Sequence, residues 1–507
     1  MKRELLVVFV TAVALYLPTA RYGFVQDDRG IIVANPAAHS VGAALAAFDE
    51  PYWPRESGGG LYRPVTILSY ALDWTISDGR PGWFHIMNAL WHGLAAVLFV
   101  LVAARWLPPV PAAGAGLVFA WHPLHVEAVA SLVGRAELLV AVGILGAVLA
   151  ARRGRWALAV LCAALAMFSK EHGVITGVVI LLDKWLQPPD DRPYPRGFWV
   201  ALGLVTLGFL AAWLAVGWVE ANDSAAAFFG TGVWRRLTMA LPAVLRATAL
   251  LFWPASLSSD YSPQVLPARS EISVAALVGF CVVVGVPALV VWCRRRAPAI
   301  SFAAGLAALS YLPTANILFA SGIVLAERTL YLAVALPAAL AGWVVASLAT
   351  RRGLRPAGIA GALLVVACGA RSFVRLPAWR DNRSQLLTLL RDHPESYRGH
   401  GSAAAVLAAI GDTAGARREY RIADSLFPSD PYFYGGYAIF LVGIGDTAAA
   451  VPLVERGKQS HTGDRMSLRA QFVLELARGH HAQAAALADS AGRRFAGERN
   501  WYLRFQQ

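Results

Sequence analysis

Apolar runs separated by shorter polar segments fill most of the chain up to residue 375. Several of these runs approach the roughly 20 residues that a helix needs to cross the hydrocarbon core of a bilayer. We therefore predict an all-α polytopic membrane protein of about eleven transmembrane helices. The predicted spans are residues 4–21, 85–106, 110–128, 132–151, 155–169, 173–187, 197–218, 272–293, 299–319, 329–349 and 357–375.

Two parts of this pattern allow more than one interpretation. Residues 155–187 read as two short helices around Ser169–Gly173, but one long broken helix is an alternative that would reverse the topology of everything downstream. Residues 234–253 are apolar enough to cross, yet a crossing there would move the arginine triplet 294–296 to the other side of the membrane. We therefore interpret 234–253 as an interfacial or re-entrant helix within a second external segment, 219–270.

Composition and charge agree with a membrane protein. Of the 507 residues, 57% are hydrophobic and only 15% are charged, and the mean hydropathy is +0.51, which excludes a soluble protein of this size. The net charge of +13 lies at the ends of apolar runs, so it follows the positive-inside rule and does not indicate nucleic-acid binding. With Lys2 and Arg3 inside, we read the first run as a retained helix. The four cysteines lie in or beside apolar runs and predict neither a disulfide framework nor a zinc site.

The region 376–507 is polar and contains a repeat. Gly411-Asp412-Thr413 recurs as Gly445-Asp446-Thr447, and Gly479 continues the 34-residue spacing of the glycines. A 34-residue period with small residues at packing positions is the signature of tetratricopeptide repeats, which form an α-solenoid with a concave surface for an extended polypeptide. With eleven crossings, this region lies outside the cytoplasm. The alanines that keep the same interval are Ala416, Ala450 and Ala484.

The polar segment 22–84 joins the first two predicted spans and is rich in Trp, Tyr, Pro and Gly. It carries two adjacent carboxylates, Asp27 and Asp28, near the membrane surface on the side opposite the N-terminus. Like charges at adjacent positions raise one of the two pKa values, so such a pair can supply a general base. The competing interpretation is that both aspartates cap a short helix in the loop.

Further ionisable residues lie on the same predicted side of the membrane, and such residues at membrane depth are functional candidates by default. Cations there could clamp a phosphate, and an arginine can do so with two parallel hydrogen bonds. The residues that we assign to donor-phosphate or substrate binding are Arg63, His122, His125, Glu127, Arg135, Lys170, Glu171, Glu327 and Arg328.

The charged motifs also have structural interpretations. Glu327 and Arg328 can satisfy each other at the start of a helix. Lys170 and Glu171 can terminate two short helices, although a lysine at that depth is costly unless it is paired.

The two histidines of His122-Pro-Leu-His125 have a loose metal-ligand spacing. Zinc needs a third and a fourth ligand, and the sequence names none, so we assign no metal site. A histidine that donates to a substrate oxygen or caps a helix is the preferred interpretation, and a divalent cation is left open.

The motifs occur in a fixed order along the chain. They are Phe24-Val-Gln-Asp27-Asp28, Asn35-Pro36, Tyr62-Arg63-Pro64, His122-Pro-Leu-His125-Val-Glu127, Gly134-Arg135-Ala-Glu137, Ser169-Lys170-Glu171-His172-Gly173 and Ala326-Glu327-Arg328-Thr-Leu-Tyr331. In this order they resemble the transmembrane-and-tetratricopeptide-repeat family of protein O-mannosyltransferases, in the C-type superfamily of polyprenyl-phosphate-sugar glycosyltransferases. The resemblance spans nearly the whole chain and is most specific over residues 119–139.

The resemblance implies that residues 1–375 form a transmembrane glycosyltransferase domain whose first external loop is catalytic, and that residues 376–507 form an external repeat domain. A polyprenyl-phosphate sugar would enter between helices, and an acceptor hydroxyl would attack the anomeric carbon with inversion. Asp27 or Asp28 would take the proton, and the cations would stabilise the leaving phosphate. The repeats would present Ser or Thr of an exported polypeptide. No cofactor is required beyond this lipid-linked donor.

The array is shorter than that of the animal members, and the composition is rich in Ala and Arg. Both features favour a bacterial inner-membrane protein with its site and repeats on the extracytoplasmic side. Two alternatives stay open: the same enzyme class with a glycan or lipid acceptor, and a non-catalytic scaffold that holds partners through its repeats. A transporter is disfavoured because transporters place ionisable groups near the midplane. The sugar, and which aspartate is the base, are left undetermined by the sequence.

Overall fold

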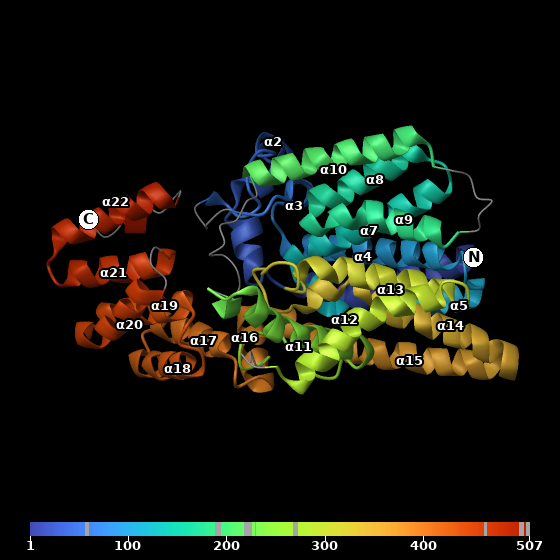
Figure 1. Ribbon diagram of the computed structural model, residues 1–507. Coiled ribbons are helices and arrows are strands. Elements are labelled where there is room, and N and C mark those ends of the chain that lie inside the picture. The colour runs from blue at the N-terminus through green and yellow to red at the C-terminus, as the bar shows by residue number, and fades with distance from the viewer. Residues whose placement is uncertain are drawn as a thin grey trace.

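The computed structural model describes residues 1–55, 60–187, 194–216, 226–228, 230–266, 272–460, 464–495 and 501–502. Within these ranges the regular elements are helices and no strand occurs, so the predicted all-α class is confirmed for this part of the chain. A long bundle of helices is followed by a smaller group of helices beyond one of its ends (Figure 1). The N-terminus lies at the other end of the bundle.

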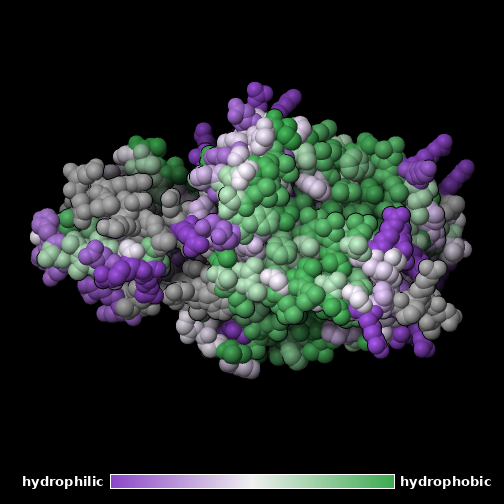
Figure 2. All heavy atoms as spheres, turned by 90° about the horizontal axis from the view of Figure 1, so that it is seen from above, coloured by the Kyte–Doolittle hydropathy of each residue, from purple (hydrophilic) through white to green (hydrophobic). Residues whose placement is uncertain are grey.

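Apolar helices build the bundle. Among the described residues, seven helices are long and apolar enough to cross a membrane, and three shorter apolar helices accompany them. On the face of the bundle that Figure 2 shows, hydrophobic residues cover the middle, whereas hydrophilic residues gather toward the ends. The protein is therefore an integral membrane protein, while the number of crossings stays a prediction. The bundle helices are α1 (Lys2–Tyr16), α4 (Pro81–Ala103), α5 (Pro109–Trp121), α7 (Arg135–Arg152), α8 (Trp156–Ser169), α9 (Thr176–Trp185), α10 (Arg196–Val216), α12 (Val274–Cys293), α13 (Pro298–Tyr311), α14 (Ala335–Arg352) and α15 (Leu354–Arg375).

Helix α7 is the most enclosed of these elements, because all but two of its residues are buried. Close approach of α8 depends on Gly143, where an added Cβ would lie 2.7 Å from the carbonyl oxygen of Cys162 and 2.8 Å from the backbone nitrogen of Ala166. Small residues of this kind let membrane helices pack backbone to backbone.

The segment between α1 and α4 is a folded unit with its own apolar core rather than an irregular loop. Its helices are α2 (Val41–Ala46) and α3 (Pro64–Ser77), and short helical turns occur at Arg29–Val33 and Pro36–Ala38. The core includes Ile31, Tyr52, Ile67 and Tyr70. Helix α3 is not predicted from the polar character of the segment, and α4 begins at Pro81, before the expected start at 85.

The break between α8 and α9 decides the ambiguity over residues 155–187. Two separate short helices are present, and a turn at Glu171–Ile175 connects them. An added Cβ on Gly173 would lie 2.4 Å from the carbonyl carbon of Ala166, so the chain doubles back against the end of α8.

Helix α11 (Val233–Phe252) covers the region interpreted as an interfacial helix. One of its faces is buried and includes Met239, Ala243 and Leu251, while Trp253 just beyond its end is exposed. Whether it lies in the membrane interface stays a prediction. Within the predicted external segment 219–270, residues 219–225, 229 and 267–270 lie outside the described residues.

Beyond α15, helix α16 (Asn382–Asp392) precedes three helix pairs. Each helix begins 34 residues after its counterpart in the preceding pair, as the sequence period predicts. Gly411, Gly445 and Gly479 have φ values of 85°, 84° and 79° and end the first helix of each pair, a left-handed position that glycine adopts without steric cost. Pro431 occupies the first position of the helix that starts the second pair. The pairs are α17 (Tyr397–Ala409) with α18 (Thr413–Leu426), α19 (Pro431–Gly443) with α20 (Thr447–Ser460), and α21 (Arg465–Ala477) with α22 (His481–Arg494).

Candidate functional site

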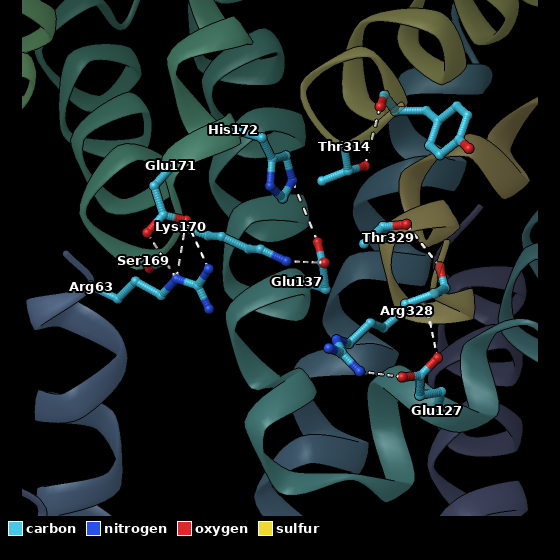
Figure 3. A network of polar contacts seen from close by, with 12 residues as sticks. Arg63, Glu127, Glu137, Ser169, Lys170, Glu171, His172, Thr314, Arg328 and Thr329 are labelled. Carbon is cyan, nitrogen blue, oxygen red and sulfur yellow. Dashed lines mark hydrogen bonds and ion pairs between the residues drawn. The ribbon is translucent and has the colours of Figure 1, made fainter. Parts of the chain in front are cut away.

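The charged motifs come together at the end of the bundle nearest to the C-terminal helices. They lie where helices stop: α5 ends at Trp121, α8 ends at Ser169, and a helical turn at Glu327–Leu330 leads toward α14. Because these breaks fall at one end of the bundle, segments that are far apart in the sequence become neighbours. Ion pairs then connect one motif to another (Figure 3).

Arg63 is the cation at the start of α3. Its Nε donates to both carboxylate oxygens of Glu171 at 3.1 Å, and its Nη2 donates to Oε2 at 2.8 Å. The guanidinium also lies over the ring of Tyr52, with Cζ 4.8 Å from the ring centroid. These contacts fix the orientation of Arg63 from two sides, and its side chain remains 12% exposed.

Lys170 and Arg328 pair with carboxylates on the next elements. Lys170 binds Glu137 of α7, and His172 Nε2 lies 3.5 Å from the second oxygen of that carboxylate. Arg328 Nη1 binds Glu127 of α6 (His125–Ala130), whose other oxygen accepts the backbone N–H of Arg328 at 2.9 Å. The side chain of Arg328 is 27% exposed.

The local pair of Glu327 with Arg328 that the sequence allowed is wrong, because Arg328 pairs with Glu127 and Glu327 accepts hydrogen bonds from Ser258 and Tyr261. Lys170 and Glu171 do lie at the break after α8, as the structural interpretation expects, and the lysine is paired there with Glu137.

Arg63 and Arg328 each have N–H donors that their ion pairs do not use. Among the described residues, no hydrogen-bond partner is found for Nη1 of Arg63 or for Nε and Nη2 of Arg328. A guanidinium carries five N–H donors in a planar fork, so one arginine can bind a carboxylate and an added anion together. The cluster can thus hold a phosphate without first losing its ion pairs.

The two adjacent aspartates have different surroundings. Asp28 is fully buried; its Oδ2 accepts the N–H of Val25 and its Oδ1 accepts the N–H of Val133, each at 2.9 Å. Burial raises the pKa of Asp28 to about 7, although these hydrogen bonds oppose the shift. Asp28 thus ties its loop to the turn before α7.

Asp27 is only partly buried. Its negative charge raises the pKa of Arg328, after the larger contribution of Glu127, so its carboxylate lies within electrostatic reach of that cation. The preceding residue, Gln26, has a φ of 48°, and its N–H donates to Oδ1 of Asn382 at 2.7 Å. Asp27 is therefore the accessible member of the pair. It directly follows the turn at Gln26, which α16 stabilises through Asn382.

Arg135 is not available as a phosphate clamp, which corrects the prediction. It is fully buried and forms an ion pair with Asp73 at 2.5 Å. Its Nε donates to Asn88 Oδ1 at 2.7 Å, and its Nη1 and Nη2 donate to the carbonyl oxygens of Ser69 and Phe84. All three nitrogens are engaged by protein groups, so Arg135 fastens α3, α4 and α7 together.

His122 and His125 are also placed within the protein interior. The Nε2–H of His122 donates to the carbonyl oxygen of Leu251 at 3.1 Å, and that of His125 donates to the carbonyl oxygen of Tyr331 at 3.0 Å. The His125 ring packs on the Tyr331 ring, with centroids 4.2 Å apart. These contacts hold the α5–α6 corner, and with it Glu127, so neither side chain reaches the ion-paired cluster in this structure.

Glu327 faces away from Arg328 into the loop after α11. Its Oε1 accepts the N–H of Ser258 at 2.6 Å and the hydroxyl of Tyr261 at 2.9 Å, and its Oε2 is buried without a hydrogen-bond partner. Burial raises the pKa of Glu327 to about 7, while Arg375 opposes the shift. Its contact with a substrate stays a prediction.

Several residues of the site are not evident from the sequence. Asp73 is a single carboxylate within an apolar stretch, which is a signal for a buried partner, but nothing in the spacing connects it to Arg135. Asn382 lies in the predicted repeat domain yet contacts the turn before Asp27. Among the described residues, no group of three His, Cys, Asp or Glu side chains could hold a metal ion.

The fold and the site define a class: a helical integral membrane protein with a partly buried charged cluster at one end of its bundle. Within this class, the chain is similar to proteins named protein O-mannosyl-transferases. It is 26% identical over 443 residues to one from Caenorhabditis elegans, covering 84% of this chain and 63% of the relative. It is 28% identical over 375 residues to TMTC3 of Homo sapiens, covering 65% and 41%.

A third relative, Tmtc2 of Drosophila melanogaster, is 42% identical over 133 residues, which is 25% of this chain and 14% of the relative. The chain thus matches less than two thirds of the length of these relatives. No family model matches the chain, and no solved structure does.

Proposed function

We propose that the chain is a membrane glycosyltransferase that moves one sugar, mannose or another hexose, from a polyprenyl-phosphate donor to Ser or Thr of exported proteins. One observation carries the proposal: a partly exposed carboxylate, Asp27, lies at the same end of the bundle as Arg63, Lys170 and Arg328. A proton acceptor and phosphate-binding cations are the groups that this transfer needs. The names of the relatives support a protein acceptor and mannose.

In the proposed reaction, the oxygen of the acceptor hydroxyl attacks the anomeric carbon of the donor. The bond from that carbon to the phosphate oxygen breaks, the lipid phosphate leaves with the electron pair, and the hydroxyl proton passes to Asp27. A single displacement of this kind inverts the anomeric centre and needs one base and no covalent sugar–enzyme intermediate.

The cations act on the leaving group in this scheme. Negative charge develops on the phosphate as it departs, and fixed positive charges stabilise it best when they need no reorganisation. Glu171, Glu137 and Glu127 hold Arg63, Lys170 and Arg328 in place. They act as positioning residues for the phosphate site.

The C-terminal helices would present the acceptor. Their 34-residue period is that of tetratricopeptide repeats, and stacked repeats of this kind bind extended polypeptide. We place the cluster and the repeats on the extracytoplasmic side of a bacterial inner membrane, because basic residues gather at the opposite ends of the apolar runs.

The proposal is tested with the purified full-length protein in detergent, polyprenyl-phosphate mannose carrying a radiolabel, and a pool of exported proteins. Asp27→Asn should lower label transfer by at least about 100-fold without changing thermal stability, because a general base contributes 10²–10⁴-fold to rate. Asp28→Asn should lower the free energy of unfolding by about 1–3 kcal/mol, because an amide offers one acceptor oxygen to two backbone N–H groups.

Asp49→Asn is the matched control, since Asp49 is an exposed aspartate of the same segment. Equal transfer by wild type and Asp27→Asn would remove Asp27 as the base. Label found in glycan or lipid but not in protein would change the acceptor class.

A further inference from the structure

A second polar site lies where the bundle meets the C-terminal helices. An open cavity of about 540 Å³ is lined by the end of α15, the turn at Leu376–Trp379, α16 and the loop at 255–257. We call it the arginine pocket, after four residues of its wall. They are Arg371, Arg375, Arg380 and Arg391.

Positive charge is in excess in the arginine pocket. Asp392 is shared by Arg375, at 3.3 Å, and by Arg391, at 2.9 Å. Arg380 pairs with Asp381 at 3.1 Å, and Nη2 of Arg371 donates to the carbonyl oxygen of Ala255 at 2.9 Å.

The four guanidinium groups are thus contacted by two carboxylates. Glu327, behind the wall, lies within electrostatic reach of Arg371 and Arg375, but burial favours its neutral form. A cavity with surplus guanidinium charge is suited to an anion with several acceptor oxygens.

Arg375 is the buried arginine of the wall. Its side chain is 4% exposed, yet its Nε is buried without a hydrogen-bond partner. This nitrogen is closed off from solvent, so it lies behind the cavity surface, whereas Nη1 of the same guanidinium binds Asp392 of the wall.

The surroundings of the arginine pocket are apolar and exposed. Val374, which lines the cavity, is 73% exposed, and Trp253, at the end of α11, is 77% exposed. Val374 lies near the end of α15, which is apolar enough to cross a membrane, and Trp253 follows the last residue of α11. Exposed tryptophan is typical of the membrane–water interface. A ligand bound in the arginine pocket would contact guanidinium groups inside the cavity and the acyl chains of the membrane outside it.

We infer that the arginine pocket binds the phosphate-bearing headgroup of an anionic membrane lipid, with the acyl chains lying along the exposed apolar face of α15. A free phosphate compound shares the headgroup chemistry but would leave the apolar surroundings unused. The site is separate from the ion-paired cluster, because none of Arg63, Lys170 and Arg328 lines it.

Native mass spectrometry of the full-length protein in detergent tests the inference, with phosphatidylglycerol, phosphatidylcholine and glycerol 3-phosphate as separate probes. The variant Arg380→Gln/Arg391→Gln removes two charges whose side chains are mostly exposed, so the fold is retained. Each arginine near an anionic headgroup contributes to the free energy of lipid binding. Losing two of them should therefore weaken phosphatidylglycerol binding about 30-fold. Arg383→Gln, exposed on the same helix and outside the wall, is the control and should bind as wild type does.

Saturable binding of phosphatidylglycerol that the double variant loses and the control keeps supports the inference. Equal binding of phosphatidylglycerol and phosphatidylcholine, or equal binding by all three proteins, would overturn it. Glycerol 3-phosphate bound as tightly as the lipid would show a site for a soluble phosphate compound. The readout does not depend on sugar transfer, so it stands apart from the test of the proposed function.

Discussion

Burial controls the protonation of Glu327. One oxygen of this carboxylate has two donors and the other has none, and burial raises its pKa from 4.5 to about 7. Arg375 and the Tyr261 hydroxyl oppose the shift, while the charge of Glu127 adds to it. The neutral carboxyl is thus favoured until the solution approaches neutral pH.

This shift predicts a pH dependence of stability. The folded protein holds more protons on Glu327 than the unfolded chain does between about pH 4.5 and 7, so the free energy of unfolding should fall as pH rises through that window. The full difference is about 3 kcal/mol. Glu327→Gln keeps the acceptor oxygen and removes the titration, so the melting temperature of wild type should fall more than that of the variant between pH 5 and pH 8.

Glu50→Gln serves as the control, because Glu50 is exposed and should leave the wild-type pH dependence unchanged. Parallel melting curves for wild type and Glu327→Gln would show that Glu327 stays charged in the folded protein.

Whether an arginine can bind a ligand depends on its partners in the folded protein, and sequence spacing does not reveal them. Arg63 and Arg135 are both predicted as phosphate clamps, yet Asp73, Asn88 and two carbonyl groups engage all three nitrogens of the Arg135 guanidinium. Arg63 meets one carboxylate and keeps a donor free. Which of two adjacent aspartates is accessible is likewise decided by backbone N–H groups from distant segments, since Val133 binds Asp28.

At the scale of elements, the turn between α8 and α9 places the charged motif Ser169-Lys170-Glu171-His172-Gly173. Gly173 packs its Cα against the backbone of Ala166 and Met167, and this contact brings Lys170 and Glu171 to their partners. The sequence pattern predicts both short helices and the polar residues between them. It does not predict α3, which lies within a segment of polar character and packs its apolar side chains into a small core shared with Phe84 and Leu132.

Gly173→Ala tests the role of this turn. The added Cβ would lie 2.4 Å from backbone atoms that cannot rotate away, so the turn must shift. We expect a loss of about 1–3 kcal/mol in the free energy of unfolding and a larger relative loss of sugar transfer, because the cations move with the turn. Gly177→Ala on α9 is the matched control: the added Cβ would meet its nearest atom at 3.6 Å, an ordinary contact. Full transfer activity in Gly173→Ala would mean that the cations do not depend on the turn.

At the scale of the whole molecule, the C-terminal helices are joined to the loop that carries Asp27. The N–H of Gly23 donates to the carbonyl oxygen of Arg380 at 3.0 Å, and the N–H of Gln26 donates to Asn382 at 2.7 Å. A further hydrogen bond links Ser396 to Asp260 at 2.7 Å. The all-α class and the 34-residue period follow from the sequence, whereas this junction depends on contacts between residues more than 350 positions apart.

Asn382→Ala should therefore reduce sugar transfer to a short soluble acceptor peptide about tenfold, by releasing the left-handed turn at Gln26. Asn382→Asp keeps the acceptor oxygen and should restore most of the activity. A defect in acceptor docking would raise KM, whereas a misplaced base lowers kcat, so the two constants separate the explanations. An unchanged kcat in Asn382→Ala would show that the junction has no part in positioning Asp27.

Under the proposed function, the junction between α16 and the loop that carries Asp27 would also set a length scale for the acceptor. A chain held in the repeats would enter the site at a fixed distance from its anchored part, because the first helix of the C-terminal group is fastened beside Asp27. The distance along the polypeptide from the recognised segment would then determine which Ser or Thr is modified. The residues that flank each hydroxyl would not determine it. An extended chain can be measured in this way, so glycosylation would precede the folding of the acceptor.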